Sequence, residues 1–337
     1  MKNSLPKNIK KLLNPSLESF YRIVLLSIVF LISLNLASLY TGGDNNGYIS
    51  IYTGVKNLNI TDAFYLYNFV LTTIEFVHFL LVWMASNIGM DRILFLSLAN
   101  TFLAALIIKL FDSLKVHFFI TTSFILTNYY LYVIMFTAER LKFGFIFFLL
   151  FYLAWKRSKK VAPFFLFLSI FSHLQMLVVC LGKAFEIFIQ ELKPLIFKFR
   201  LRSRVLLFLP IVLIAFVYIN ATQISGLPYI FYKIYAYGGD RDIFDFLRMM
   251  IFFIIALSYT SDKKETSIYF LPLFVAVYFV GGDRVNMIGY IFSMYYCLPY
   301  RSGFNLGALI TSFYFLYVNI DFVSKIFLYG NGFPPQS

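Results

Sequence analysis

Long apolar runs recur along almost the whole chain and restrict it to one fold class. Hydrophobic residues make up 60% of the 337 residues, charged residues 13%, and the mean hydropathy is +0.78, well beyond the usual range of soluble domains. A helical membrane crossing needs about 20 apolar residues. The stretches that approach this length are 23–40, 65–86, 92–111, 116–136, 139–155, 161–181, 205–221, 246–260, 267–281, 285–299 and 304–323. The sequence therefore predicts an all-α, polytopic integral membrane bundle of ten or eleven spans, forming a single transmembrane domain over residues 1–337.

Basic clusters predict how this bundle is oriented. The net charge is +13, and short clusters of Lys and Arg between spans favour the cytoplasmic side and contacts with lipid headgroups. They are not typical of a nucleic-acid interface, so membrane lipids and not RNA or DNA are the expected partners. The clusters lie at residues 7–11, 156–160, 200–204 and 263–264. We expect a multi-pass membrane protein with a cytoplasmic N-terminus, outer loops at 41–64 and 222–245, and an irregular or interfacial segment at 183–204.

One stretch conflicts with a simple count of spans. Arg140 and the basic cluster at 156–160 are separated by one span, yet counting whole spans places both in the cytoplasm. The stretch 116–136 is interrupted by several Thr, Ser and Asn residues, and polar backbone at membrane depth is tolerated where it lines a cavity. We therefore expect 116–136 to be a broken or re-entrant pair that enters and leaves on the same side, which places Arg140 near the outer face.

The tripeptide Gly-Gly-Asp occurs three times, each time beside an apolar run, and ends at Asp44, Asp240 and Asp283. Arginine follows two of these aspartates, as Arg241 and Arg284. Glycine accepts positive φ, so a helix can end there and present backbone donors beside the charges. Ordinary turns also use this sequence. Carboxylates and guanidinium groups at a membrane surface suggest an anionic, lipid-linked substrate.

Several ionisable residues lie within or at the ends of apolar runs, where each needs a partner or a wet cavity. Glu75 follows Asn68 and Thr72 at helical spacing, and this predicts a polar stripe on one helix. His173 is a candidate proton acceptor or phosphate contact, although a lone histidine is more often a packing residue. Arg140 and Arg284 open apolar helices and suit a bidentate hold on phosphate, with snorkelling to headgroups as the alternative.

Two further groups complete the candidate residues. Glu139, beside Arg140, is either a general base or a counter-ion. The outer loop and the first Gly-Gly-Asp segment carry tyrosines that suit sugar stacking. They are Tyr48, Tyr229, Tyr232 and Tyr235. The segment Asp240-Arg241-Asp242 has the Asp-x-Asp form of a metal site, but it lies on an outer loop without nucleotide, so neither a metal nor another cofactor is expected.

The order of these motifs resembles the EpsG family of exopolysaccharide polymerases, which are relatives of the Wzy O-antigen polymerases. The segment 42–48 is similar to the family's Gly-x-Asp-x-x-x-Tyr loop, and Glu75 falls where an acidic residue opens the next helix. The segment 139–144 resembles an arginine motif, here altered from Arg-Gln-x-x-Ala. Phe171-Ser172-His173 and the run from Asp283 to Tyr290 resemble the family's later His and Arg-x-x-x-Tyr motifs.

This resemblance implies a glycosyltransferase with a fold similar to other polyprenyl-dependent membrane enzymes. It would join undecaprenyl-pyrophosphate-linked oligosaccharide repeats at the outer face of the bacterial inner membrane, without metal and with inversion. A Wzz-like chain-length regulator is an implied partner. We expect the pyrophosphate to meet Arg140, Arg241 and Arg284, the proton to be taken by Asp44, Glu139 or His173, and the remaining substrate contacts to include Glu75, Asp240, Asp283 and Tyr290. An O-antigen ligase or a lipid-linked oligosaccharide flippase is the alternative.

Overall fold

The computed structural model describes residues 15–180, 242–280 and 282–333, together with scattered positions between 182 and 231, and this part of the chain is almost entirely helical. The N-terminal elements are α1 (Pro15–Leu39), α2 (Asn45–Gly54), α3 (Ile60–Leu71), α4 (Phe76–Asn87), α5 (Arg92–Ser113), α6 (Phe118–Thr127), α7 (Tyr129–Phe136), α8 (Glu139–Lys156) and α9 (Ala162–Ser172). After the two-residue antiparallel strands β1 (Gln223–Ile224) and β2 (Leu227–Pro228) come α13 (Ile243–Tyr259), α14 (Lys263–Val280), α15 (Gly282–Cys297), the 3-10 turn η1 (Tyr300–Gly303) and α16 (Leu306–Tyr329).

Apolar helices of membrane-spanning length support the predicted class. Within the described residues, three helical stretches are long and apolar enough to cross a membrane, namely 18–39, 92–113 and 300–329. The count rises to five if the bent pairs α3–α4 and α6–α7 each form one span. The structure is therefore that of an all-α membrane bundle, and the predicted total of ten or eleven spans exceeds what these helices show.

The structure describes the predicted loops only in part. The segment 41–64, expected as an outer loop, is largely helical because it contains α2 and the start of α3. The segment 183–204 lies outside the described residues. The segment 222–245 lies mostly outside them too, apart from the two short strands and the start of α13.

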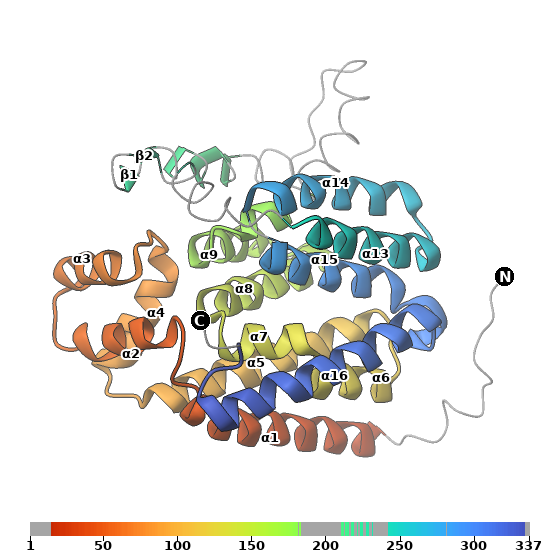
Figure 1. Cartoon of the computed structure of the whole chain (residues 1–337), viewed down its shortest axis with the longest axis horizontal. Helices are drawn as coiled ribbons and strands as arrows, with labels where there is room; N and C mark the ends of the chain where they lie inside the picture. Colours follow the sequence, from red (N-terminus) through yellow and green to blue (C-terminus); the bar gives the residue numbers. More distant parts are fainter. Residues whose placement is uncertain are drawn as a thin grey trace.

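The long helices run between two ends of the molecule (Figure 1). At the first, here called the cavity end, α5 and α8 both begin, and Arg92 contacts Glu139 at 2.8 Å. At the other, here called the basic end, Lys156 at the end of α8 lies 3.4 Å from the Ser113 carbonyl at the end of α5. The C-terminal segment returns α16 to the cavity end, where the carbonyl of Gly330, a left-handed residue with φ of 66°, accepts a hydrogen bond from the Thr41 amide.

The predicted same-side course of 116–136 is wrong. The stretch is broken at Asn128, whose side chain accepts a hydrogen bond from the Leu131 amide and starts α7, and the two helices are bent by 55°. It nevertheless runs from the basic end, where the His117 amide bonds the Ser302 carbonyl, to the cavity end, where α8 begins.

The segment that returns to its own side is α3–α4. These helices are bent by 116°, and the turn residue Thr72 has a left-handed φ of 45°. Asn57, before α3, bonds Asn87, at the end of α4, at 2.9 Å. The expected continuous helix through Glu75 is therefore replaced by a break, which removes one crossing from the count and explains why Arg140 and Lys156 lie at opposite ends.

Candidate functional site

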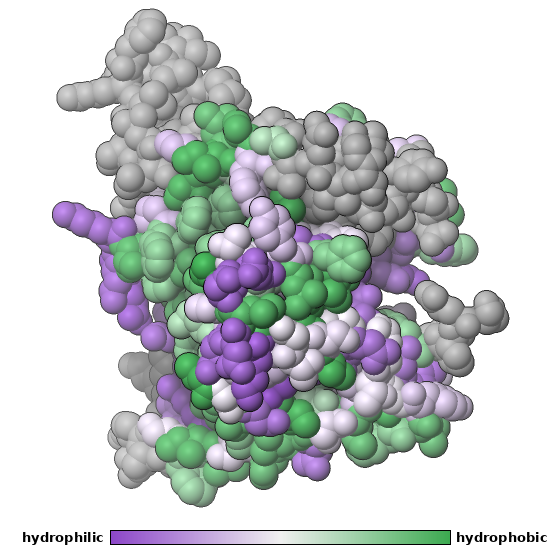
Figure 2. Space-filling model, turned by 90° about the vertical axis from the view of Figure 1, so that its left-hand side faces the viewer, coloured by the Kyte–Doolittle hydropathy of each residue, from purple (hydrophilic) through white to green (hydrophobic). Residues whose placement is uncertain are grey.

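A cavity of about 950 Å³ opens at the cavity end between helices from both halves of the chain. Figure 2 shows this end of the molecule, where hydrophilic residues gather among hydrophobic ones. Six of the residues singled out from the sequence line the cavity: Asp44, Tyr48, Arg140, His173, Asp283 and Arg284. Segments separated by more than two hundred residues in the sequence thus meet at one concave surface.

Arg140 lies in the first turn of α8 and is held from two sides. Its Nη1 lies 2.6 Å from a carboxylate oxygen of Glu75, and its Nε donates to the Tyr48 hydroxyl at 2.9 Å. Burial raises the pKa of Tyr48 to about 12, so the hydroxyl stays neutral and accepts this hydrogen bond throughout the physiological pH range. The guanidinium therefore has a fixed position on the cavity wall.

Glu75 occupies the break between α3 and α4 and is 1% exposed. Besides Arg140, its carboxylate contacts Nδ1 of His173 and accepts hydrogen bonds from the Thr73 hydroxyl at 2.8 Å and the Leu174 amide at 3.3 Å. Glu75 does not line the cavity. The predicted substrate contact stays a prediction; in the structure this carboxylate holds two residues, Arg140 and His173, that do line the cavity.

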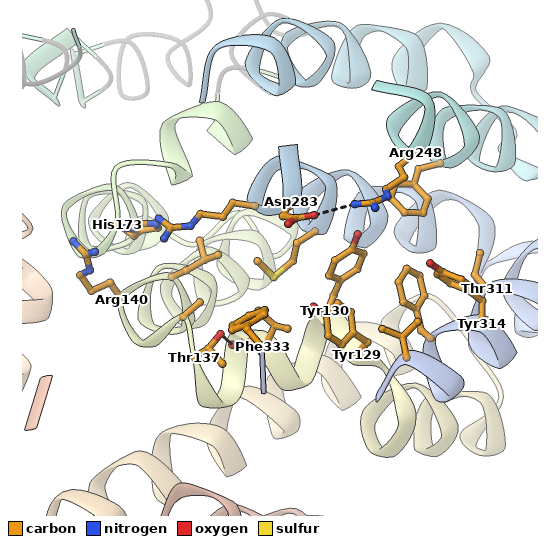
Figure 3. Close-up of a pocket in the computed structure, with 18 of the residues that line it drawn as sticks. Tyr129, Tyr130, Thr137, Arg140, His173, Arg248, Asp283, Thr311, Tyr314 and Phe333 are labelled. Atoms are coloured by element: carbon orange, nitrogen blue, oxygen red, sulfur yellow. Dashed lines mark hydrogen bonds and ion pairs between the residues drawn. The ribbon is translucent and has the colours of Figure 1, made fainter. Parts of the chain in front are cut away.

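His173 terminates α9 and also has partners on both ring nitrogens. Nδ1 contacts Glu75, and Nε2 lies 3.1 Å from the Gln175 side-chain oxygen. Arg140 and Arg284 are both within electrostatic reach of the imidazole. The ring is thus an oriented part of the cavity wall beside two cationic side chains (Figure 3).

Glu139 forms a second cluster of the same composition. Its carboxylate lies 2.8 Å from Arg92 Nη2 and 3.4 Å from His78 Nε2, and His78 Nδ1 lies 2.8 Å from the Tyr67 hydroxyl. Glu139 is 5% exposed, and none of these four residues lines the cavity. Glu139 is therefore the counter-ion of Arg92 and not of the adjacent Arg140, and its carboxylate does not line the cavity where a base would act.

The opposite wall of the cavity carries an arginine that sequence analysis missed. Arg248 of α13 lies 2.9 Å from Asp283, whose side chain is 85% exposed, and Figure 3 shows this pair facing the side of the cavity that holds Arg140 and His173. Arg248 lies near the start of the predicted apolar span 246–260, the same signal that drew attention to Arg140 and Arg284. Arg92 was missed in the same way.

Asp44 is an exposed carboxylate that lines the cavity, in contrast to the buried Glu75. It precedes α2, is exposed, and its side chain does not cap that helix. Gly43 before it has a left-handed φ of 60°, as the Gly-Gly-Asp motif predicts, so the chain turns and brings Asp44 to the cavity.

The described tyrosines include one core residue among the candidates and five residues that line the cavity. Tyr290, expected at the substrate, is fully buried: its hydroxyl accepts a hydrogen bond from Asn128 at 3.0 Å and its ring packs on Phe315 with centroids 4.4 Å apart. Tyr290 is therefore a core residue that does not line the cavity. The tyrosines that line the cavity are Tyr40, Tyr48, Tyr129, Tyr130 and Tyr314. The candidates Tyr229, Tyr232, Tyr235, Asp240 and Arg241 lie outside the described residues.

Comparison with known proteins gives no relative: no protein-family model, no curated protein and no solved structure matches this chain. Among the residues that the structure describes, no group of three His, Cys, Asp or Glu side chains is placed to hold a metal ion. The residues that line the cavity are therefore the basis for proposing a function.

Proposed function

We propose that this chain is a membrane glycosyltransferase that polymerises undecaprenyl-pyrophosphate-linked oligosaccharide repeats. The observation that carries the proposal is the composition of the cavity. Arg140 and Arg284 line it together with tyrosines, and its walls continue into apolar side chains of α13 and α16. Such a surface suits a substrate with an anionic group, sugars that stack on aromatic rings and a long apolar tail.

The distribution of charge supports an outer-face site. The basic end carries Lys156, the cluster that follows it, and Lys263 at the start of α14. Short basic segments favour the cytoplasmic side, so the cavity end faces outward in the bacterial inner membrane. There the donor and the acceptor are both lipid-linked glycans, and a Wzz-like protein is the proposed regulator of chain length.

The reaction is a displacement at an anomeric carbon. An acceptor hydroxyl attacks, a new glycosidic bond forms, and the bond to pyrophosphate breaks with its electron pair going to the leaving group. Because negative charge grows on the pyrophosphate, fixed guanidinium groups stabilise the transition state more than the ground state. Arg140 and Arg284 supply that charge, and a single displacement inverts the configuration.

The hydroxyl proton must pass to a base. Sequence analysis left Asp44, Glu139 and His173 open. Glu139 is buried away from the cavity, and both ring nitrogens of His173 are engaged. Asp44, exposed at the cavity, is therefore the proposed base, since a base must reach the acceptor hydroxyl.

The test is Arg284→Ala, with Arg301→Ala as a matched control on an exposed arginine at the basic end. Loss of the guanidinium should lower polymerisation about 10²–10³-fold, as for removal of one oxyanion donor, while insertion into the membrane stays normal. Gel profiles of lipid-linked glycans should then show single repeats in place of long polymer. Unchanged chain length in Arg284→Ala would contradict the assignment.

A deletion strain separates this function from its alternatives. Single repeats that still reach their final acceptor indicate a lost polymerase. Long chains left on the polyprenyl carrier indicate a lost ligase, and the absence of repeats on the outer face indicates a lost flippase. Only the first profile agrees with the proposal.

A further inference from the structure

We infer that the isoprenoid tail of the substrate lies in a lateral groove between α13 and α16, so that the substrate enters the cavity sideways from the membrane. This inference rests on the proposed function for the identity of the tail. The groove itself is defined by the packing of the two helices.

The two helices approach each other most closely near the basic end. A Cβ at Gly307 would lie 2.8 Å from Ile255 Cγ2 and from Tyr259 Cε2, and the Gly307 amide donates to the Tyr259 hydroxyl at 3.3 Å. Glycine is required here because the helix surfaces approach so closely. Elsewhere α13 packs mainly on α14 and α15, and α16 mainly on α6 and α7.

Toward the cavity end the helices diverge, as Figure 1 shows. Side chains from both helices then line the same cavity: Ile251 and Ile255 from α13, and Ile310, Tyr314 and Val318 from α16. Phe252 and Phe315, with ring centroids 6.4 Å apart, are buried at its floor. The result is a V-shaped groove, closed at the basic end and widening into the cavity.

The groove is accessible and apolar. Ile251 is 55% exposed and Ile310 is 58% exposed, and both side chains form part of the cavity wall. In a membrane such side chains contact hydrocarbon. The groove therefore offers a path along which an apolar chain never leaves an apolar environment.

Continuity with the arginines identifies the occupant. The groove and the guanidinium groups of Arg140 and Arg284 belong to one cavity. A ligand whose tail lies along α13 and α16 thus places an attached anionic group beside those arginines. A polyprenyl pyrophosphate joins these two properties in one molecule, whereas a free phosphate or a free sugar has no use for the apolar groove.

The experiment uses the full-length chain in lipid nanodiscs and a photoreactive polyprenyl pyrophosphate whose label is placed on the isoprenoid tail. Mass spectrometry of the labelled protein should identify peptides of α13 and α16. Ile310→Trp should lower labelling about tenfold, the order expected when an apolar site is overfilled. Phe313→Trp is the matched control, because Phe313 lies on the same helix, is 71% exposed and does not line the cavity.

Label on other helices, or equal labelling of Ile310→Trp and wild type, overturns the inference. If Ile310→Trp does not yield monodisperse protein, Val318→Phe narrows the same groove from a position about two turns further along α16. Polymerisation with a long-chain and a short, soluble prenyl donor separates the two proposals. A substitution that fills the groove should lower polymerisation with the long-chain donor and leave polymerisation with the short donor unchanged. Labelling of α13 and α16 without polymer from either donor in wild type would refute the proposed function and leave the groove standing.

Discussion

Two clusters at the cavity end contain the same three residue types in the same arrangement. In the Glu75 cluster, a buried carboxylate bridges Arg140 and His173; in the Glu139 cluster, it bridges Arg92 and His78. Arg140 and His173 line the cavity, and no member of the Glu139 cluster does. The same residue types thus occupy two environments: one cluster presents charge to the cavity, and the other joins α4, α5 and α8.

Both clusters put a carboxylate where it cannot be solvated. Burial of an isolated charge is costly, and removal of one partner from a buried pair leaves the other uncompensated. The two clusters should therefore contribute similarly to stability and differently to activity. Each of the following variants separates these two quantities.

The largest effects are expected for Arg140→Ala and Arg92→Ala. Each leaves a buried glutamate without its main counter-ion, so the free energy of unfolding should fall by about 3–5 kcal/mol in both. Only Arg140→Ala should also lower the polymerisation rate per folded molecule, by about 10²–10³-fold. Thermal unfolding of purified protein measures the first quantity, and polymer formed per folded molecule the second. Equal loss of activity in the two variants would remove the distinction between the clusters.

Smaller effects are expected for Glu75→Gln and Glu139→Gln, which keep the side-chain shape and remove the charge. Each should destabilise the protein by about 1–3 kcal/mol through weakened buried hydrogen bonds. Because Glu75 positions Arg140, Glu75→Gln should also slow polymerisation about tenfold, equivalent to about 1.4 kcal/mol. Glu139→Gln should leave the rate per folded molecule unchanged. A reversed order would mean that the Glu139 cluster is the one that acts on the substrate.

The smallest effects concern the tyrosine attached to each cluster. Tyr48→Phe removes the acceptor for Arg140 Nε, and Tyr67→Phe removes the partner of His78. Each should cost about 0.5–1.5 kcal/mol of stability, and only Tyr48→Phe should reduce activity. With a pKa of about 12, Tyr48 stays protonated from pH 6 to about pH 10, so the ratio of wild-type to Tyr48→Phe activity should be constant over that range. A ratio that changes with pH would contradict the neutral hydroxyl.

Most helix positions could be predicted from the sequence. Apolar runs at 92–111 and 304–323 correspond to α5 and α16, and the break within 116–136 was expected from its Thr, Ser and Asn residues. The run 65–86 looked equally continuous. At its break, residues 72–75, Glu75 contacts Arg140 and His173, which are 65 and 98 residues away, and hydrophobic periodicity contains no information on such contacts.

The sequence identified single candidate residues of the site but not which of them lie together. An ionisable side chain in an apolar run must have a partner or a wet cavity, and this rule selected Arg140, Glu75 and His173 correctly as unusual residues. It did not say which of them meets the cavity. Tyr290, singled out by the family resemblance, is buried in the core, and Arg248, which was not singled out, lines the cavity.

Composition and apolar run length are properties that each segment carries alone, because transfer of a helix into hydrocarbon depends on its own side chains. They suffice to determine a helical membrane protein and the approximate position of its helices. Charge compensation is a property of pairs, and the partners here come from distant segments. The division of two equal Glu, Arg and His clusters into one that faces a cavity and one that is sealed was therefore decided by how the helices pack.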